Sequence, residues 1–121
     1  MLRLSPPWES RELSFSLFLI WYFVIGFLLS NGVPHFVFGA AGKTFRSPFG
    51  QNSSPRTNVI WGLSNFVLAT VIAAALAALD LYSDYAIAAL LLGFWLVVLM
   101  FGTGIQRFLN EPQGNTPRPT P

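Results

Sequence analysis

The residues of this chain that could do chemistry are few, and most of them fall between residues 32 and 58. His35 is the only histidine, and Lys43 and Arg46 follow it closely. A histidine at a membrane edge can bind a metal or pigment or carry a proton. One ligand makes a poor metal site, however, and this segment holds no carboxylate or cysteine. We therefore expect an ordinary interfacial or hydrogen-bonded histidine, no metal and no cofactor, with Pro34, His35, Lys43 and Arg46 as the candidate functional loop.

The basic residues Lys43, Arg46 and Arg56 suggest a second kind of contact. They could bind anionic lipid headgroups or the acidic surface of a partner, or they could serve only to orient the chain in the membrane. These hypotheses stay open. The serines nearby have no local base to make them nucleophiles, so no catalytic residue is predicted. The net charge is only +2 and the basic residues are scattered, which does not indicate nucleic-acid binding.

A polar pair lies inside an apolar run at Ser64 and Asn65. It could contact a substrate, but an amide beside small residues more often bonds one helix to another. Small residues at four-residue spacing allow helix backbones to approach closely, and Gly93 offers a weaker version of the same feature. We therefore predict helix contacts along one row, which consists of Asn65, Ala69, Ala73 and Ala77.

Three uncharged apolar runs must position these residues. They extend over about residues 13–30, 59–79 and 85–105, and together they fill about half of the chain. Roughly 20 helical residues cross a hydrocarbon core of about 30 Å. With 53% hydrophobic residues and only 10% charged ones, the composition agrees. The predicted fold is all-α: a single integral membrane domain (1–106) with three transmembrane helices.

The connections between the runs complete this prediction. Asn31, Gly32 and Pro34 are expected to end the first helix, because glycine and asparagine accept left-handed geometry and proline breaks the hydrogen-bond ladder. Residues 32–42 would then lie in the interface or re-enter the membrane. Residues 80–84 form a short turn, which predicts an antiparallel hairpin of the second and third spans. The Pro-rich tail at 107–121 is expected to be disordered.

Basic residues also predict the orientation. The 32–58 loop and the tail share one side and carry more Lys and Arg than the N-terminus and the 80–84 turn. The positive-inside rule then places the loop and tail in the cytoplasm and the N-terminus outside.

Residues 30–66 carry a distinctive string: Ser30-Asn31-Gly32-Val33-Pro34-His35-Phe36, then Gly39, Gly42, Phe45 and Ser47-Pro48-Phe49, then Ser54-Pro55, Asn58-Val59-Ile60-Trp61-Gly62 and Asn65-Phe66. This string resembles a group of uncharacterised small bacterial integral membrane proteins. The resemblance implies a bacterial inner-membrane setting and interest in the Pro34–His35 segment and Asn65, and it transfers no catalytic residue. Small multidrug transporters are similar in length and apolarity, but their essential acidic residue in the first span has no counterpart here.

Function is predicted mainly from what the spans lack. No Asp, Glu, Lys, Arg or His lies within the three runs, and an intramembrane ionisable residue is the usual sign of a proton or ion path. The favoured hypothesis is a structural or accessory component that self-associates or joins a larger membrane complex. The alternative is a homo-oligomeric small transporter or channel for a small or apolar solute. An enzyme comes third.

Overall fold

The computed structural model describes residues 6–110, with side chains described for residues 6, 7 and 17–104. The elements are α1 (Pro7–Ala40), β1 (Phe45–Ser47), β2 (Gly50–Ser53), α2 (Pro55–Ala78) and α3 (Ala86–Asn110). The last four residues of α3 fall within the stretch expected to be a disordered tail. The rest of that stretch, 111–121, lies outside the described residues.

All three helices are long and apolar enough to cross a membrane. The candidate spans are Leu17–Ala40, Pro55–Ala78 and Ala86–Gly104. At about 1.5 Å per residue, even the 19-residue third span reaches about 28 Å, close to the thickness of a hydrocarbon core. The prediction of a mainly helical chain with three such spans is confirmed.

The first helix does not end where its sequence suggests. It continues through Gly32 and Pro34 to Ala40, so residues 32–40 are helical and not an interfacial or re-entrant loop. A Cβ atom on Gly32 would lie 2.6 Å from the Phe66 ring, and one on Gly62 would lie 2.7 Å from the backbone N of Phe36. These glycines therefore bring α1 and α2 into close contact. The prediction had taken Gly32 as a sign that the first helix ends.

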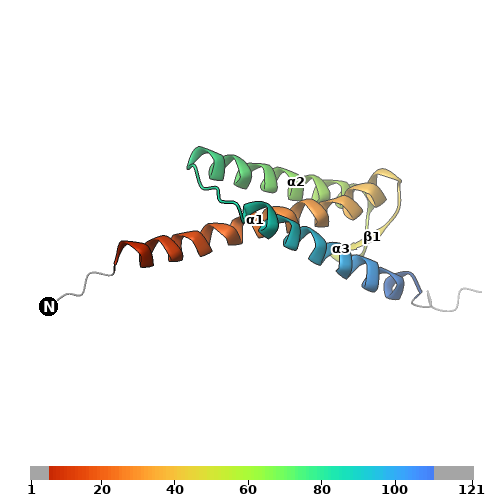
Figure 1. Ribbon diagram of the computed structural model, residues 1–121. Coiled ribbons are helices and arrows are strands. Elements are labelled where there is room, and N and C mark those ends of the chain that lie inside the picture. Colours follow the sequence, from red (N-terminus) through yellow and green to blue (C-terminus); the bar gives the residue numbers. More distant parts are fainter. Residues whose placement is uncertain (1–5, 111–121) are drawn as a thin grey trace, which may run out of the picture.

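Helix α1 is the centre of the fold. Both α2 and α3 pack against it, and no comparable packing joins α2 to α3 in the described part of the chain. Figure 1 shows α2 and α3 on either side of α1. A Cβ atom on Gly26 would collide with the backbone of Leu90, and one on Gly93 with the backbone of Phe23. The expected hairpin of the second and third spans is therefore not a packed pair, because the closest backbone approach of α3 is to α1.

A short antiparallel β-hairpin joins α1 to α2. Ser54 caps the following helix, since its Oγ accepts a hydrogen bond from the backbone N–H of Thr57 at 3.1 Å. Pro55 takes the first helical position, where its missing N–H costs nothing. At the opposite end of α2, the Tyr22 hydroxyl donates to the carbonyl of Leu81 at 2.6 Å and so ties α1 to the 80–84 turn.

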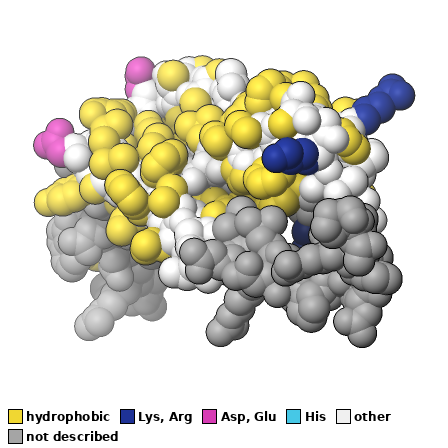
Figure 2. All heavy atoms as spheres, turned by 90° about the vertical axis from the view of Figure 1, so that its right-hand side faces the viewer, with side chains coloured by type: hydrophobic (Ala, Val, Ile, Leu, Met, Phe, Trp, Pro, Cys, Tyr) yellow, Lys and Arg dark blue, Asp and Glu magenta, His cyan; other side chains and the backbone are white. Residues whose placement is uncertain are grey.

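Many large apolar side chains are exposed, and hydrophobic side chains cover much of the coloured face in Figure 2. Leu92 is 67% exposed, and Val67, Leu99 and Ile20 are also more than half exposed. Trp21 and Trp95 point outward as well. A water-soluble chain of this size rarely exposes so much contiguous apolar surface, whereas a lipid environment solvates it.

Candidate functional site

The most buried polar contact lies where α1, the hairpin and α2 meet. It consists of His35 and Asn58, together with Ser47 and Ser53, whose hydroxyl groups form a hydrogen bond with each other. His35 is 5% exposed, and Asn58 is completely buried. The Asn58 Nδ2 donates to the carbonyl oxygens of Phe45 at 2.9 Å, Ser53 at 3.1 Å and Ser54 at 3.2 Å. One amide therefore holds both strands of the hairpin and the N-cap of α2.

The donors of Asn58 determine which tautomer the neutral ring of His35 adopts. The Asn58 nitrogen faces three carbonyls, so its Oδ1 is the atom that lies 2.9 Å from the His35 Nδ1. That oxygen can only accept, so the Nδ1 atom must carry the proton. In the neutral ring, the Nε2 atom then holds the lone pair.

Aromatic rings cover the imidazole. The ring of His35 lies edge-on to Phe45, with 5.2 Å between centroids, and edge-on to Phe101 at 6.3 Å. Phe38 stacks on Phe45 at 4.7 Å. The cluster brings together α1, β1 and α3. His35 is therefore a buried, hydrogen-bonded histidine. Among the described residues no three of His, Asp or Glu gather into a group that could hold a metal ion.

Two turns beyond Asn58 on α2 and one turn before His35 on α1, a second amide contact joins the two helices. The Asn31 Nδ2 donates to the Asn65 Oδ1 at 3.1 Å, and the Asn65 Nδ2 donates to the carbonyl of Trp61 at 2.8 Å. Asn65 is buried, which places it in the helix contact expected for an interhelical amide. Its neighbour Ser64 is exposed and donates to its own helix, at the carbonyl of Ile60.

The predicted small-residue row only partly follows the helix contact. Ala69 is completely buried, whereas Ala73 and Ala77 are exposed. Residues four apart advance by about 400° around a helix of 3.6 residues per turn, so such a row drifts by about 40° per step. The buried face of α2 advances by four, three, four and then seven residues instead, and it consists of Asn58, Gly62, Asn65, Ala69 and Leu76. Gly93 lies where α3 approaches α1.

The described charged side chains separate between the two ends of the bundle. Lys43, Arg46 and Arg56 are exposed around the hairpin, and Asp80 and Asp84 are exposed in the turn between α2 and α3. Figure 2 shows Lys and Arg side chains at one side of the visible face and acidic side chains at the opposite side. Pro34 lies apart from these cations, on the face of α1 that lines a pocket.

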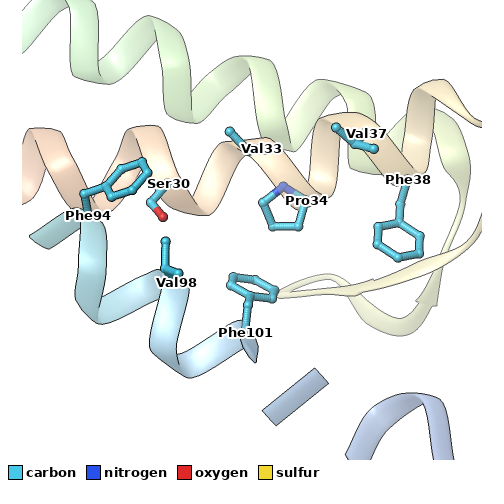
Figure 3. Close-up of a pocket in the computed structure, with 8 residues that line it drawn as sticks. All are labelled: Ser30, Val33, Pro34, Val37, Phe38, Phe94, Val98 and Phe101. Carbon is cyan, nitrogen blue, oxygen red and sulfur yellow. The ribbon is translucent and has the colours of Figure 1, made fainter. Parts of the chain in front are cut away.

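That pocket is an apolar cavity of about 330 Å³ between α1 and α3. Figure 3 shows its lining, in which α1 contributes one wall and Phe94, Val98 and Phe101 of α3 the other. The α1 wall consists of Ser30, Val33, Pro34, Val37 and Phe38. Ser30 is the one hydroxyl-bearing residue among these lining residues.

Sequence reasoning missed Asn58 and Asn31, which it assigned to a loop and a helix end. A signal was present, because Asn58 and Asn65 are seven residues apart and so share one face of a helix. Asn31 and His35 are four apart and share a face in the same way. Across the contact between α1 and α2, Asn31 bonds to Asn65 and His35 bonds to Asn58.

Comparison with family models, with curated proteins and with solved structures returns no match for this chain.

Proposed function

We propose that this chain is a structural or accessory component of a membrane assembly, which self-associates or joins a larger complex through the outer face of α2. One observation carries the proposal: the Ala-rich second half of α2 is largely unused by the fold. Ala73, Ala74, Ala77 and Ala78 are all exposed, and Leu76 between them is buried against α1. In lipid, helices associate through small residues that let their backbones approach.

The polar side chains support an assembly role over a chemical one. The Asn58 amide is occupied by three carbonyls and His35, and Asn65 by Asn31 and Trp61. Ser64 and Thr70 each donate to a carbonyl of their own helix. These bonds hold the helices and hairpin together. A homo-oligomeric transporter or channel is the alternative, and it would need Asn65 and Ser64 to line a path between copies.

The proposed location is a bacterial inner membrane, with the N-terminus outside and the hairpin and C-terminal tail in the cytoplasm. Its support is the position of Lys43, Arg46 and Arg56 around the hairpin, since cytoplasmic ends of spans are enriched in Lys and Arg. These exposed cations can also attract anionic lipid headgroups, with about 1 kcal/mol per charge near the surface.

Cross-linking in native membranes, followed by purification in mild detergent, tests the assembly role. We expect a cross-linked oligomer or a copurifying membrane protein with the native chain, and its loss in the double variant Ala74→Leu, Ala78→Leu. Ala88→Leu is the matched control, because it makes the same change at an exposed position of α3. Recovery of monomer alone from the native chain would contradict the proposal.

A second pair of measurements separates assembly from transport. We expect Asn65→Ala to weaken the packing of α2 on α1 without changing the flux of any solute, because Asn65 bonds to Asn31 inside the chain. Altered flux with intact assembly would favour the transporter alternative.

A further inference from the structure

We propose that the β-hairpin between α1 and α2 lies in the headgroup region of the membrane and binds anionic phospholipid there. Its tip, Pro48 and Phe49, inserts at the boundary with the acyl chains, and Lys43 and Arg56 bind the headgroup phosphates. This role is additional to the assembly role and rests only on the membrane placement of the helices. Three features support it: the depth of the hairpin, the bonding of its turn and the charges around it.

The hairpin folds back against the sides of the helices. In β1, the ring centroid of Phe45 lies 5.2 Å from that of His35. The Phe49 ring lies edge-on to Trp61, with 5.5 Å between centroids. His35 precedes the end of α1 by five residues and Trp61 follows the start of α2 by six, which places both about 7–9 Å inside the helix ends. Amphipathic segments at a membrane surface lie at a similar depth, about 5–10 Å into the boundary of headgroups and acyl chains.

The tip presents apolar surface at this depth. Phe49 is 71% exposed, although its ring contacts Trp61. Pro48 beside it is exposed as well. Exposed apolar side chains are unfavourable in water, whereas their transfer into the boundary of headgroups and acyl chains is favourable. Lipid is therefore the surrounding that suits this tip.

The turn also bonds its own polar groups. Pro48 has no backbone N–H, and the N–H of Phe49 donates to the Ser47 Oγ atom at 3.1 Å. The Ser53 hydroxyl donates to the carbonyl of Gly50 at 2.9 Å. A backbone group that loses water without gaining a partner costs free energy. Because neither residue of the tip presents a free backbone N–H, the tip can leave water without leaving an amide donor unpaired.

The charges around the hairpin select the kind of lipid. Lys43 and Arg56 are exposed close to the point where α1 ends and α2 begins. The two helices touch there, since a Cβ atom on Gly39 would lie 2.5 Å from the carbonyl oxygen of Pro55. Residues 41–58 contain no Asp or Glu. Each cation near the surface strengthens binding to anionic lipid about fivefold, which corresponds to roughly 1 kcal/mol, so this end favours anionic over zwitterionic headgroups.

Fluorescence quenching tests the depth of the tip. The chain contains no cysteine, so Pro48→Cys and Asp84→Cys each provide one site for an NBD fluorophore. In nanodiscs of phosphatidylglycerol and phosphatidylcholine, we expect nitroxides on the lipid chains to quench the probe at residue 48 and aqueous iodide to quench it only weakly. The probe at residue 84, in the exposed turn between α2 and α3, should show stronger quenching by iodide. In the Pro48→Cys background, Phe49→Ser should raise quenching by iodide, whereas Tyr82→Ser, at an exposed aromatic residue of the opposite turn, should not.

Retention of lipid tests the selection by charge. The protein is extracted from the same nanodiscs in mild detergent, and native mass spectrometry counts the lipids that it keeps. We expect the native chain to keep phosphatidylglycerol over phosphatidylcholine. The double variant Lys43→Gln, Arg56→Gln should lower this preference by about 25-fold, which is about fivefold for each cation. Lys43→Arg with Arg56→Lys preserves both charges and should preserve the preference.

Three results would overturn the inference. Quenching by iodide that is as strong at residue 48 as at residue 84 would place the tip in water. Protection of the probe at residue 48 from both iodide and lipid nitroxides would show that protein covers the tip. Equal retention of the two lipids by the native chain would exclude selection by charge, and this measurement needs no variant to fold.

Cross-linking on the same samples keeps the two proposals separate. A lipid-buried tip on a chain that yields only monomer contradicts the assembly role. A water-exposed tip on a chain that yields an intact oligomer contradicts the lipid role. Circular dichroism of each variant verifies that the helices are intact.

Discussion

The Nδ1 atom of His35 lies 2.9 Å from the Oδ1 atom of Asn58, and this hydrogen bond connects α1 to the start of α2. The same asparagine donates to carbonyls of β1, β2 and the cap of α2. A single buried contact thus fixes the connection between two helices. Polar contacts of this kind are strong where water is excluded, because the alternative is an unpaired group.

The tautomer of His35 is directly testable, because the chain holds one histidine. We expect the neutral ring to carry its proton on Nδ1, since the Asn58 oxygen can only accept. Two-bond 1H–15N correlation spectra of histidine-labelled protein distinguish the two tautomers. A proton on Nε2 in the neutral ring would contradict the assigned orientation of the Asn58 amide.

Asn58→Asp should destabilise the protein far more than its small change in shape suggests. The substitution replaces a donor to three carbonyls with an acceptor, and we expect a loss of about 2–4 kcal/mol in the free energy of unfolding. Unfolding by titration with a denaturing detergent measures it. Asn52→Asp makes the same change at an exposed hairpin position and should have little effect. Equal losses in the two variants would show that the buried amide has no special role.

Gly93→Ala should weaken the docking of α3. Its new methyl group would collide with the backbone of Phe23, which cannot move without shifting α1. We expect a loss of about 1–3 kcal/mol in the free energy of unfolding, as is typical of overpacking. Gly102→Ala is the matched control, since the added Cβ would meet no described atom within 4 Å apart from its own stretch of helix. A better helix former at that open position should be neutral or slightly stabilising. A stable Gly93→Ala variant would contradict the close approach of α1 and α3.

Single cysteines can establish the orientation, because the native chain contains none. Lys43 and Asp84 are both exposed, one near the hairpin and one in the turn between α2 and α3. With a membrane-impermeant maleimide added to intact cells, we expect labelling of Asp84→Cys and protection of Lys43→Cys. Both should react after the cells are opened. The reverse pattern would place the hairpin outside.

The apolar runs predicted the three helices well, because length and lack of charge alone determine whether a helix can cross a bilayer. The boundary of the first helix was wrong for a specific reason. Gly32 is a weak helix former, but in the fold its missing side chain leaves room for the Phe66 ring. Local propensity cannot show which partner will approach a glycine, so it could not separate a helix end from a helix contact.

The candidate site was predicted in part. His35 was singled out by its rarity, and Asn65 by its polarity within an apolar run. Asn58 was missed, because it stands next to the polar run that precedes α2 and so resembles a loop residue. Its role depends on carbonyls of residues 45, 53 and 54 that only the folded hairpin brings within reach.

The central position of α1 has a consequence for biosynthesis. Because α1 is made first and both later helices dock on it, each helix that leaves the ribosome meets a partner already in the membrane. The hairpin brings α2 to α1 early, since only residues 41–54 separate the two helices. No helix has to open an existing pair in order to insert. The chain can therefore assemble in the order of its translation, one docking step at a time.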